Sequence, residues 1–158
     1  MSKLNKIVNN ILDVGLAASV AVVFIVTFLQ VISRFVFRLN IPWSTDIIRL
    51  SFVYTVFLGA ALGMRSKGHL NVDVVFNALP ERVRKITGLG INILLLFFLG
   101  FIFILGMQFT QSGLTQGAPY VKMPMAVYYF CVPLSALLMF YYLIQHTLEE
   151  LKSFLTKQ

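Results

Sequence analysis

The stretch "FLGAALGMRSKGHLNVD", Phe57 to Asp73, decides the fold because it begins as an apolar helix and then becomes cationic and glycine-broken. Arg65 and Lys67 are charges of the kind that hold a membrane helix at the water boundary. Gly68 then breaks the helix, since glycine is poorly suited to a helix interior. This pattern predicts a membrane-spanning helix that ends in water at Met64.

The composition of the whole chain agrees with a membrane location. Hydrophobic residues make up 58% of the 158 residues, mean hydropathy is +0.84, and only 12% of residues are charged. Soluble globular proteins carry about a quarter charged residues. The charges divide the sequence into four uncharged windows, at residues 14–33, 50–64, 86–121 and 123–148. We therefore expect an integral membrane protein.

A helix needs roughly 20 apolar residues to cross the hydrocarbon core, so each window is expected to hold one transmembrane helix. The second window is short, so its helix must extend outward through Asp46 and Arg49 toward Trp43. The expected fold is an all-α, single membrane domain over residues 1–158. Its four transmembrane helices are placed at about 11–34, 43–64, 84–112 and 124–148. Pro133 is expected to kink the fourth.

A short amphipathic helix is expected at 71–79, between the second and third spans. Val72, Val75, Phe76 and Leu79 recur at helical spacing, opposite Asp73 and other polar residues. Such a helix is too short to cross the bilayer and suits the headgroup plane. A connector packed against cytoplasmic protein is the alternative.

The distribution of Lys and Arg predicts the orientation. With both termini inside, nine basic residues lie on the cytoplasmic side and four on the outer side, as the positive-inside rule requires. The N-terminal window is longer than the apolar part of a signal peptide and lacks a small-residue cleavage site, so we expect it to remain as a helix. The net charge of +7 then reflects this bias and attraction to lipid headgroups, and nucleic acid is not needed to explain it.

Several residues are candidates for structural or partner contacts. Gln30 and Arg34 are four apart on the first span, and Arg34, Asp46 and Arg49 could form a polar cluster at the outer boundary. Independent solvation of each charge is equally compatible with the sequence. On the second span, Gly59 and Gly63 form a small-residue face that permits close approach of another helix.

Catalytic and cofactor chemistry is missing from the pattern. The sequence contains no nucleophile elbow, phosphate-binding glycine loop or metal-ligand spacing, so we expect no enzyme, no cofactor and no metal. A haem or quinone anchor would need paired histidines within the membrane. His69 and His146 both fall at the inner boundary, and Cys131 has no partner cysteine.

A transporter that works alone usually has an ionisable residue or broken helices at mid-membrane. No acid lies deep in any of the four windows. The sequence thus indicates an accessory subunit. A stand-alone four-helix exporter or lipid-binding protein is the alternative.

The segments "QVISRFVFRLNIPWSTDIIR" (30–49) and "FLGAALGMRSKGHLNVD" (57–73), followed by Leu79-Pro80, resemble the small four-helix subunit of tripartite ATP-independent periplasmic (TRAP) transporters. One departure is Thr45, where the family often has the first of two adjacent acids. The motif positions of the family fall on Gln30, Val31, Arg34, Phe35, Trp43, Asp46, Arg49, 57–61, Arg65, Gly68, His69, Val72 and Asp73.

The resemblance implies a role and a set of partners. In this family a periplasmic binding protein delivers an organic acid, such as a C4-dicarboxylate or sialic acid, to a large multi-helix subunit that moves it with Na⁺. The small subunit packs against the large one as a scaffold in the bacterial inner membrane, surrounded by lipids. Neither the organic acid carried nor the identity of the partner chain follows from the sequence.

Overall fold

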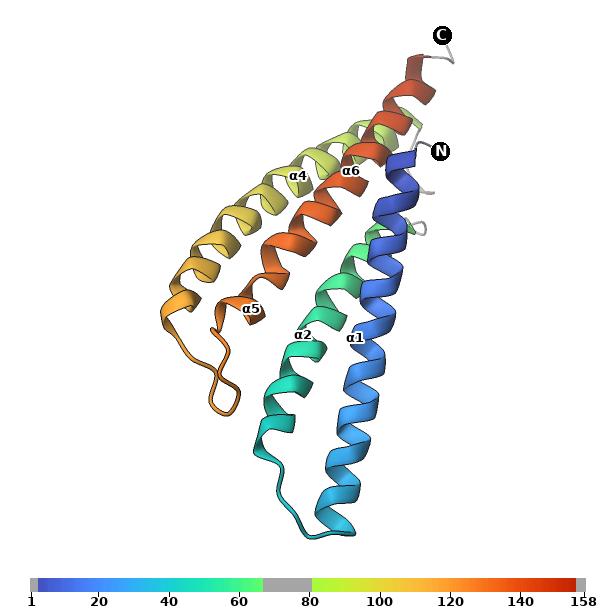
Figure 1. Cartoon of the computed structure of the whole chain (residues 1–158). Helices are drawn as coiled ribbons and strands as arrows, with labels where there is room; N and C mark the ends of the chain where they lie inside the picture. Colours follow the sequence, from blue (N-terminus) through green and yellow to red (C-terminus); the bar gives the residue numbers. More distant parts are fainter. Residues whose placement is uncertain (1–2, 67–80, 156–158) are drawn as a thin grey trace.

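The computed structural model describes residues 3–66 and 81–155, and both ranges are helical apart from their loops (Figure 1). Within these two ranges, four helices are long and apolar enough to cross a membrane, the number of spans that the sequence predicts. The segment 71–79, expected as an interfacial helix, lies outside the described residues. The elements are α1 (Lys3–Phe35), α2 (Pro42–Arg65), α4 (Glu81–Ser112), the 3-10 turn η1 (Gly113–Thr115), α5 (Ala126–Tyr129) and α6 (Cys131–Leu155).

Helix α1 begins at Lys3, well before the expected start at residue 11. The expected bound followed the apolar window, whereas the helix continues through a polar first segment. Asn5 and Asn9 in that segment hydrogen-bond to side chains of α6. With 33 residues, α1 is about 50 Å long at 1.5 Å per residue. It therefore exceeds the roughly 30 Å hydrocarbon core and must tilt or emerge into the headgroups.

The fourth span is interrupted at Phe130, between α5 and α6. Pro133 has no N–H to donate to the carbonyl of Tyr129, and its ring crowds that carbonyl. Helical bonding resumes around the break, from Phe130 N–H to Ala126 and from Leu134 N–H to Phe130. The interruption is the effect expected of Pro133.

The helices form two pairs that converge at one end (Figure 1). Helix α1 packs along α2, α4 packs along α6, and α2 also packs against α6. The pairs converge at the end that carries both termini and spread apart toward the 36–41 and 113–125 loops. We refer to these two ends as the termini end and the loop end.

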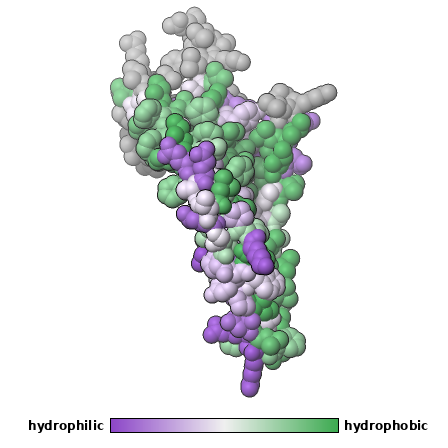
Figure 2. Space-filling view, turned by 60° about the vertical axis from the view of Figure 1, so that its left-hand side comes forward, coloured by the Kyte–Doolittle hydropathy of each residue, from purple (hydrophilic) through white to green (hydrophobic). Residues whose placement is uncertain are grey.

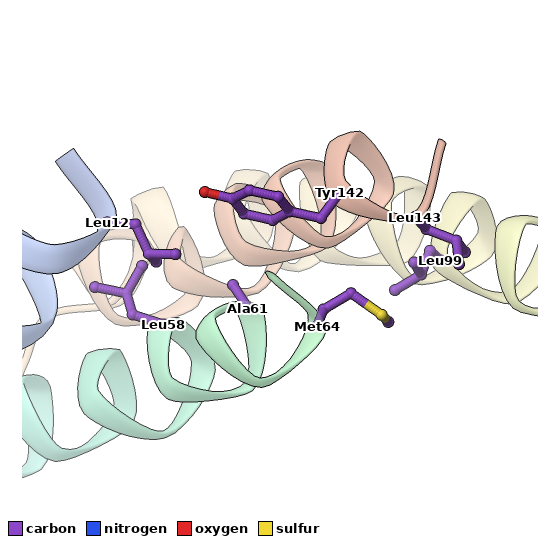
Figure 3. Close-up of a cluster of buried hydrophobic side chains, with 7 residues drawn as sticks. All are labelled: Leu12, Leu58, Ala61, Met64, Leu99, Tyr142 and Leu143. Atoms are coloured by element: carbon purple, nitrogen blue, oxygen red, sulfur yellow. The ribbon is translucent and has the colours of Figure 1, made fainter. Parts of the chain in front are cut away.

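The buried core lies where the pairs meet. It comprises Leu12, Leu58, Ala61, Met64, Leu99, Tyr142 and Leu143. Figure 3 shows Leu12 beside Leu58 and Leu143 beside Leu99, so all four long helices contribute. Burial of these apolar side chains and close packing hold the pairs together.

Large apolar side chains are exposed on all four long helices, and Figure 2 shows apolar surface beside polar residues on one face. Only 11% of the α1 span is buried, against 39% of the α6 span, and the most apolar windows belong to α1 and α4. A surface of this kind needs lipid or another apolar protein around it.

Two glycines allow close packing of α4 and η1 against α6 and α5. A Cβ at Gly113 would lie 2.7 Å from the backbone nitrogen of Ala126, and one at Gly106 would lie 3.0 Å from Pro133 Cδ. The distance at Gly113 is shorter than a real Cβ tolerates, and a Cβ at Gly106 would fit only if Pro133 shifted by a few tenths of an ångström. The 113–125 loop is a narrow hairpin closed by Ala118 N–H to Met123 and Met125 N–H to Gln116.

Candidate partner-binding surfaces

One face of α2 is left free by the other helices. Its exposed and half-exposed residues recur at alternating intervals of four and three, whereas the buried residues of α2 lie on the opposite side. Phe52 is 58% exposed and Val56 is 51% exposed. An alternation of four and three is the spacing by which one helix packs lengthwise along another. We call this set the α2 stripe: Thr45, Arg49, Phe52, Val56, Gly59 and Gly63.

Gly59 lies in the second half of the α2 stripe and has space in front of it. A Cβ added at Gly59 would meet no atom of the chain within 4 Å. By contrast, a Cβ at Gly15 on α1 would lie 3.4 Å from Leu58 Cδ1, in contact with α2. The chain's own packing therefore does not require the small residue at Gly59, and the position remains available for the close approach of a second molecule.

At the loop end, Asp46 holds the hairpin against α2. Its side chain is 1% exposed, and its Oδ2 accepts hydrogen bonds from the backbone N–H of Tyr120 at 2.7 Å and Val121 at 3.0 Å. Tyr128 O–H donates to the Asp46 backbone carbonyl at 3.2 Å. The two charge-assisted bonds to the carboxylate fix the hairpin relative to the first turns of α2, and the Tyr128 bond ties α5 to the same turn.

The hydrogen-bond partners of Asp46 are therefore not the arginines, Arg34 and Arg49, with which the sequence suggested a polar cluster. Among the residues that the structure describes, the one ion pair joins Arg65 and Asp13, at 2.8 Å. Arg34 and Arg49 are exposed, and the Asp46 carboxylate is bonded to amides instead. Backbone amides leave no pattern in a sequence, and for that reason this role was not visible there.

The remaining candidates lie in different places. Gln30 is half-buried on α1, and Trp43 is 48% exposed in the first turn of α2. Gly63 is half-exposed on the α2 stripe. Gly68, His69 and Asp73 lie outside the described residues.

A second polar network, at the termini end, was missed by the sequence reasoning. Tyr142 O–H donates to Asn9 at 2.8 Å and Gln145 donates to Asn5 at 2.9 Å, which ties α6 to α1. His146 Nε2 lies 3.1 Å from the Met64 carbonyl oxygen, which ties α6 to α2. The spacing of the two asparagines, four apart on one helix face, was the available signal.

The groove that the described residues form does not suit a charged substrate, and those residues gather no set of metal ligands. A groove between α4 and α6 has a volume of about 240 Å³, but its lining is apolar and cannot compensate a carboxylate. Within 3–66 and 81–155 no three His, Cys, Asp or Glu side chains gather as metal ligands would. The groove is lined by Leu99, Gly100, Phe103, Ala136, Leu137 and Phe140.

The chain is similar to several known proteins. It is 29% identical to the sialic acid TRAP transporter small permease protein SiaQ of Vibrio cholerae, over 72% of this chain and 65% of that protein. It is 26% identical to the C4-dicarboxylate TRAP transporter small permease protein DctQ of Vibrio cholerae, over 90% of this chain and 72% of that protein.

A third relative is much longer. The sialic acid TRAP transporter permease protein SiaT of Haemophilus influenzae is 35% identical over 52% of this chain, a match that covers 13% of SiaT. The family of tripartite ATP-independent periplasmic transporters, DctQ component, matches residues 23–153. This chain, a multi-pass membrane protein with four membrane-spanning helices, therefore belongs to the DctQ family of TRAP transporter small permease subunits.

Proposed function

We propose that this chain is the scaffold subunit of a Na⁺-coupled TRAP transporter and packs against a large permease subunit along the α2 stripe. The carrying observation is the free face of α2, on which a Cβ added at Gly59 would meet nothing within 4 Å beyond its own turn of the helix. In lipid there is no hydrophobic force between helices, so close approach at small residues drives their association. The longer relative SiaT, in which a similar segment belongs to one permease chain, supports a large permease as the partner.

The imported compound is an organic acid of the sialic acid or C4-dicarboxylate kind, delivered at the outer face by a periplasmic binding protein. The names of the relatives support these substrate classes. We assign no substrate contact to this chain, because the α4–α6 groove is apolar and Asp46 is occupied by backbone amides.

We expect uptake to require the partners. Proteoliposomes with this chain alone should take up no labelled organic acid under an inward Na⁺ gradient. Addition of the large subunit and the binding protein should restore uptake. The control is the large subunit with the binding protein but without this chain. Na⁺-dependent uptake by this chain alone would overturn the scaffold role.

The orientation that we propose places both termini in the cytoplasm and the chain in the bacterial inner membrane. Nine of the 13 Lys and Arg residues then lie inside, in agreement with the positive-inside rule. The convergence of both termini at one end of the bundle supports their lying on the same side of the membrane (Figure 1), and the charge distribution selects the cytoplasmic side. Trp43 and Tyr120, both exposed, would lie at the outer interface, where amphipathic rings are favoured. The segment 71–79 would lie in the inner headgroup plane.

Cysteine labelling tests this orientation. In a variant that lacks Cys131, a cysteine at Lys122 should react with a membrane-impermeant thiol reagent in intact cells. Cysteines at Ser2, Lys67 or Lys157 should react only after the membrane is permeabilised. Labelling of the Lys67 position from outside would contradict the proposed topology.

A further inference from the structure

The turn that joins α1 to α2 exposes apolar and cationic side chains together. Every residue in the range 34–40 is exposed. Four of them are large and apolar, with exposed fractions of 76%, 69%, 64% and 63%, and two are arginines. Apolar side chains exposed together to this extent indicate a surface that lipid or protein covers. We call these residues the α1–α2 turn: Arg34, Phe35, Val36, Phe37, Arg38 and Leu39.

The α1–α2 turn comes at the depth of the lipid headgroups. Residues 14–33 of α1 carry no charge, and at 1.5 Å per residue they span about 30 Å, the thickness of the hydrocarbon core. Arg34 therefore stands where α1 leaves the hydrocarbon, and the rest of the turn follows beyond it. This depth does not depend on the orientation of the chain, because both faces of a bilayer present headgroups.

The exposed surface of α1 is wider than one partner helix covers. Val20 is 48% exposed and Leu29 is 52% exposed, and the nine residues between these positions place them on opposite sides of the helix at 100° per residue. A single helix packed lengthwise covers a narrow stripe. Lipid must therefore contact much of α1, only 11% of whose span is buried, and the apolar side chains of the turn continue this surface.

The arginines of the turn need an anion from outside the chain. Asp46 is the single acid in the sequence from residue 14 to residue 66. It is 1% exposed and accepts hydrogen bonds from backbone amides, whereas Arg34 and Arg38 are exposed. At headgroup depth the abundant anion is the phosphate of a phospholipid. A guanidinium group matches a phosphate well, because its planar fork can donate two parallel hydrogen bonds.

The backbone of Arg38 provides an independent observation. Its φ is 55°, and it is the one non-glycine residue with positive φ in the described ranges. The N–H of Leu39 donates to the Ser33 carbonyl at 2.9 Å and closes the turn. Glycine or asparagine adopts this conformation at lower cost. The turn alone would favour glycine, so an arginine here indicates a use for its side chain.

We propose that the α1–α2 turn is a binding site for the headgroup of an anionic phospholipid. Arg34 and Arg38 bind the phosphate, and the apolar side chains of the turn lie among the upper acyl carbons. Apolar burial sets the depth of such a segment, and its cations attract anionic lipid. The long arginine side chains reach the phosphate from below it. This inference does not rest on the proposed function, because lipid surrounds the chain with or without a large subunit.

Lipid binding can be measured by native mass spectrometry of the full chain, with phosphatidylglycerol and phosphatidylcholine as the probes. The wild type should bind phosphatidylglycerol more tightly. Arg34→Gln and Arg38→Gln should each weaken that binding about fivefold, and Arg38→Lys should lose less because the charge remains. The matched control is Lys122→Gln, the same loss of charge at the loop end but outside the turn, which should leave binding unchanged. Equal losses in all three glutamine variants, or none in the arginine variants, would overturn the site.

Arg38→Gly separates lipid binding from folding. It should weaken the binding of phosphatidylglycerol as much as Arg38→Gln does, while thermal stability stays unchanged or rises, because glycine fits the turn. Unchanged lipid binding together with lower stability would show that the arginine serves only the fold. Inorganic phosphate is the remaining probe. An excess of it should not displace the lipid, and displacement would mean that the turn binds free phosphate instead.

Fluorescence quenching tests the depth of the turn. Trp43→Phe removes the single tryptophan of the chain, and Phe37→Trp then places one in the turn. A lipid that carries a quencher near its headgroup should quench this tryptophan strongly, and aqueous iodide only weakly. Strong quenching by iodide would place the turn in water and contradict the inference. If assembly with the large subunit abolishes quenching by lipid, protein covers the turn. The lipid site is then wrong and the scaffold role stands.

Discussion

Gly59→Leu is expected to separate this chain from the large permease subunit while leaving its own fold intact. The leucine side chain would extend from the α2 stripe, where a Cβ meets no atom of the chain within 4 Å. In the assembled transporter the same side chain would hold the partner helix away and remove its van der Waals contacts. We expect association to fall by about tenfold or more, with a smaller loss in Gly59→Ala.

The measurement is copurification of the two subunits from detergent, together with thermal unfolding of the variant chain. Gly100→Leu on α4 is the matched control, because a Cβ there also meets nothing within 4 Å but the position lies away from the α2 stripe. Loss of the partner in Gly100→Leu together with full retention in Gly59→Leu would move the interface to the α4 side and refute the α2 stripe.

Asp46→Ala should have the largest effect on the stability of the loop end. The substitution leaves the N–H groups of Tyr120 and Val121 without their carboxylate acceptor. Hydrogen bonds to a charged group contribute about 1.5–3 kcal/mol each, and an orphaned buried donor adds a desolvation cost. Asp46→Asn retains an acceptor oxygen without the charge, so its effect should be intermediate. The hairpin should then open, and trypsin should cleave after Lys122 faster than in the wild type.

Thermal unfolding and the rate of trypsin cleavage measure this effect. The control is Asp13→Ala, which removes a half-exposed acid and its ion pair with Arg65. This pair is partly exposed, with side-chain exposures of 28% for Arg65 and 50% for Asp13, and it lies at the termini end, away from the hairpin. Equal cleavage after Lys122 in the Asp46 and Asp13 variants would show that the carboxylate does not hold the hairpin.

The number of membrane-spanning helices and the break in the fourth span could be predicted from the sequence. The four uncharged windows predicted four helices, because backbone amides in lipid must form hydrogen bonds within their own segment. The break before Pro133 followed from the missing N–H of proline. The start of α1 at Lys3 did not follow, because helix formation continues into water wherever polar side chains find partners, as Asn5 and Asn9 do on α6.

The candidate partner-binding surfaces could be predicted only in part from the sequence. Gly59 and Gly106 look alike in the sequence, yet one faces open space and the other lies against Pro133. Only the relative placement of α2, α4 and α6 separates them. The partners of Asp46 lie more than 70 residues along the chain and are backbone groups. A carboxylate near Arg49 therefore suggested an ion pair that the geometry does not form.

The unequal burial of the four spans bears on how the chain enters the membrane during synthesis. Helices α1 and α4 have the most apolar windows, so each can partition into lipid before its neighbour is made. Each is followed by a less apolar span that packs against it, α2 on α1 and α6 on α4. Synthesis would thus deliver two helical hairpins, and the two hairpins would then join through the contact of α2 with α6, as separate helices associate after insertion.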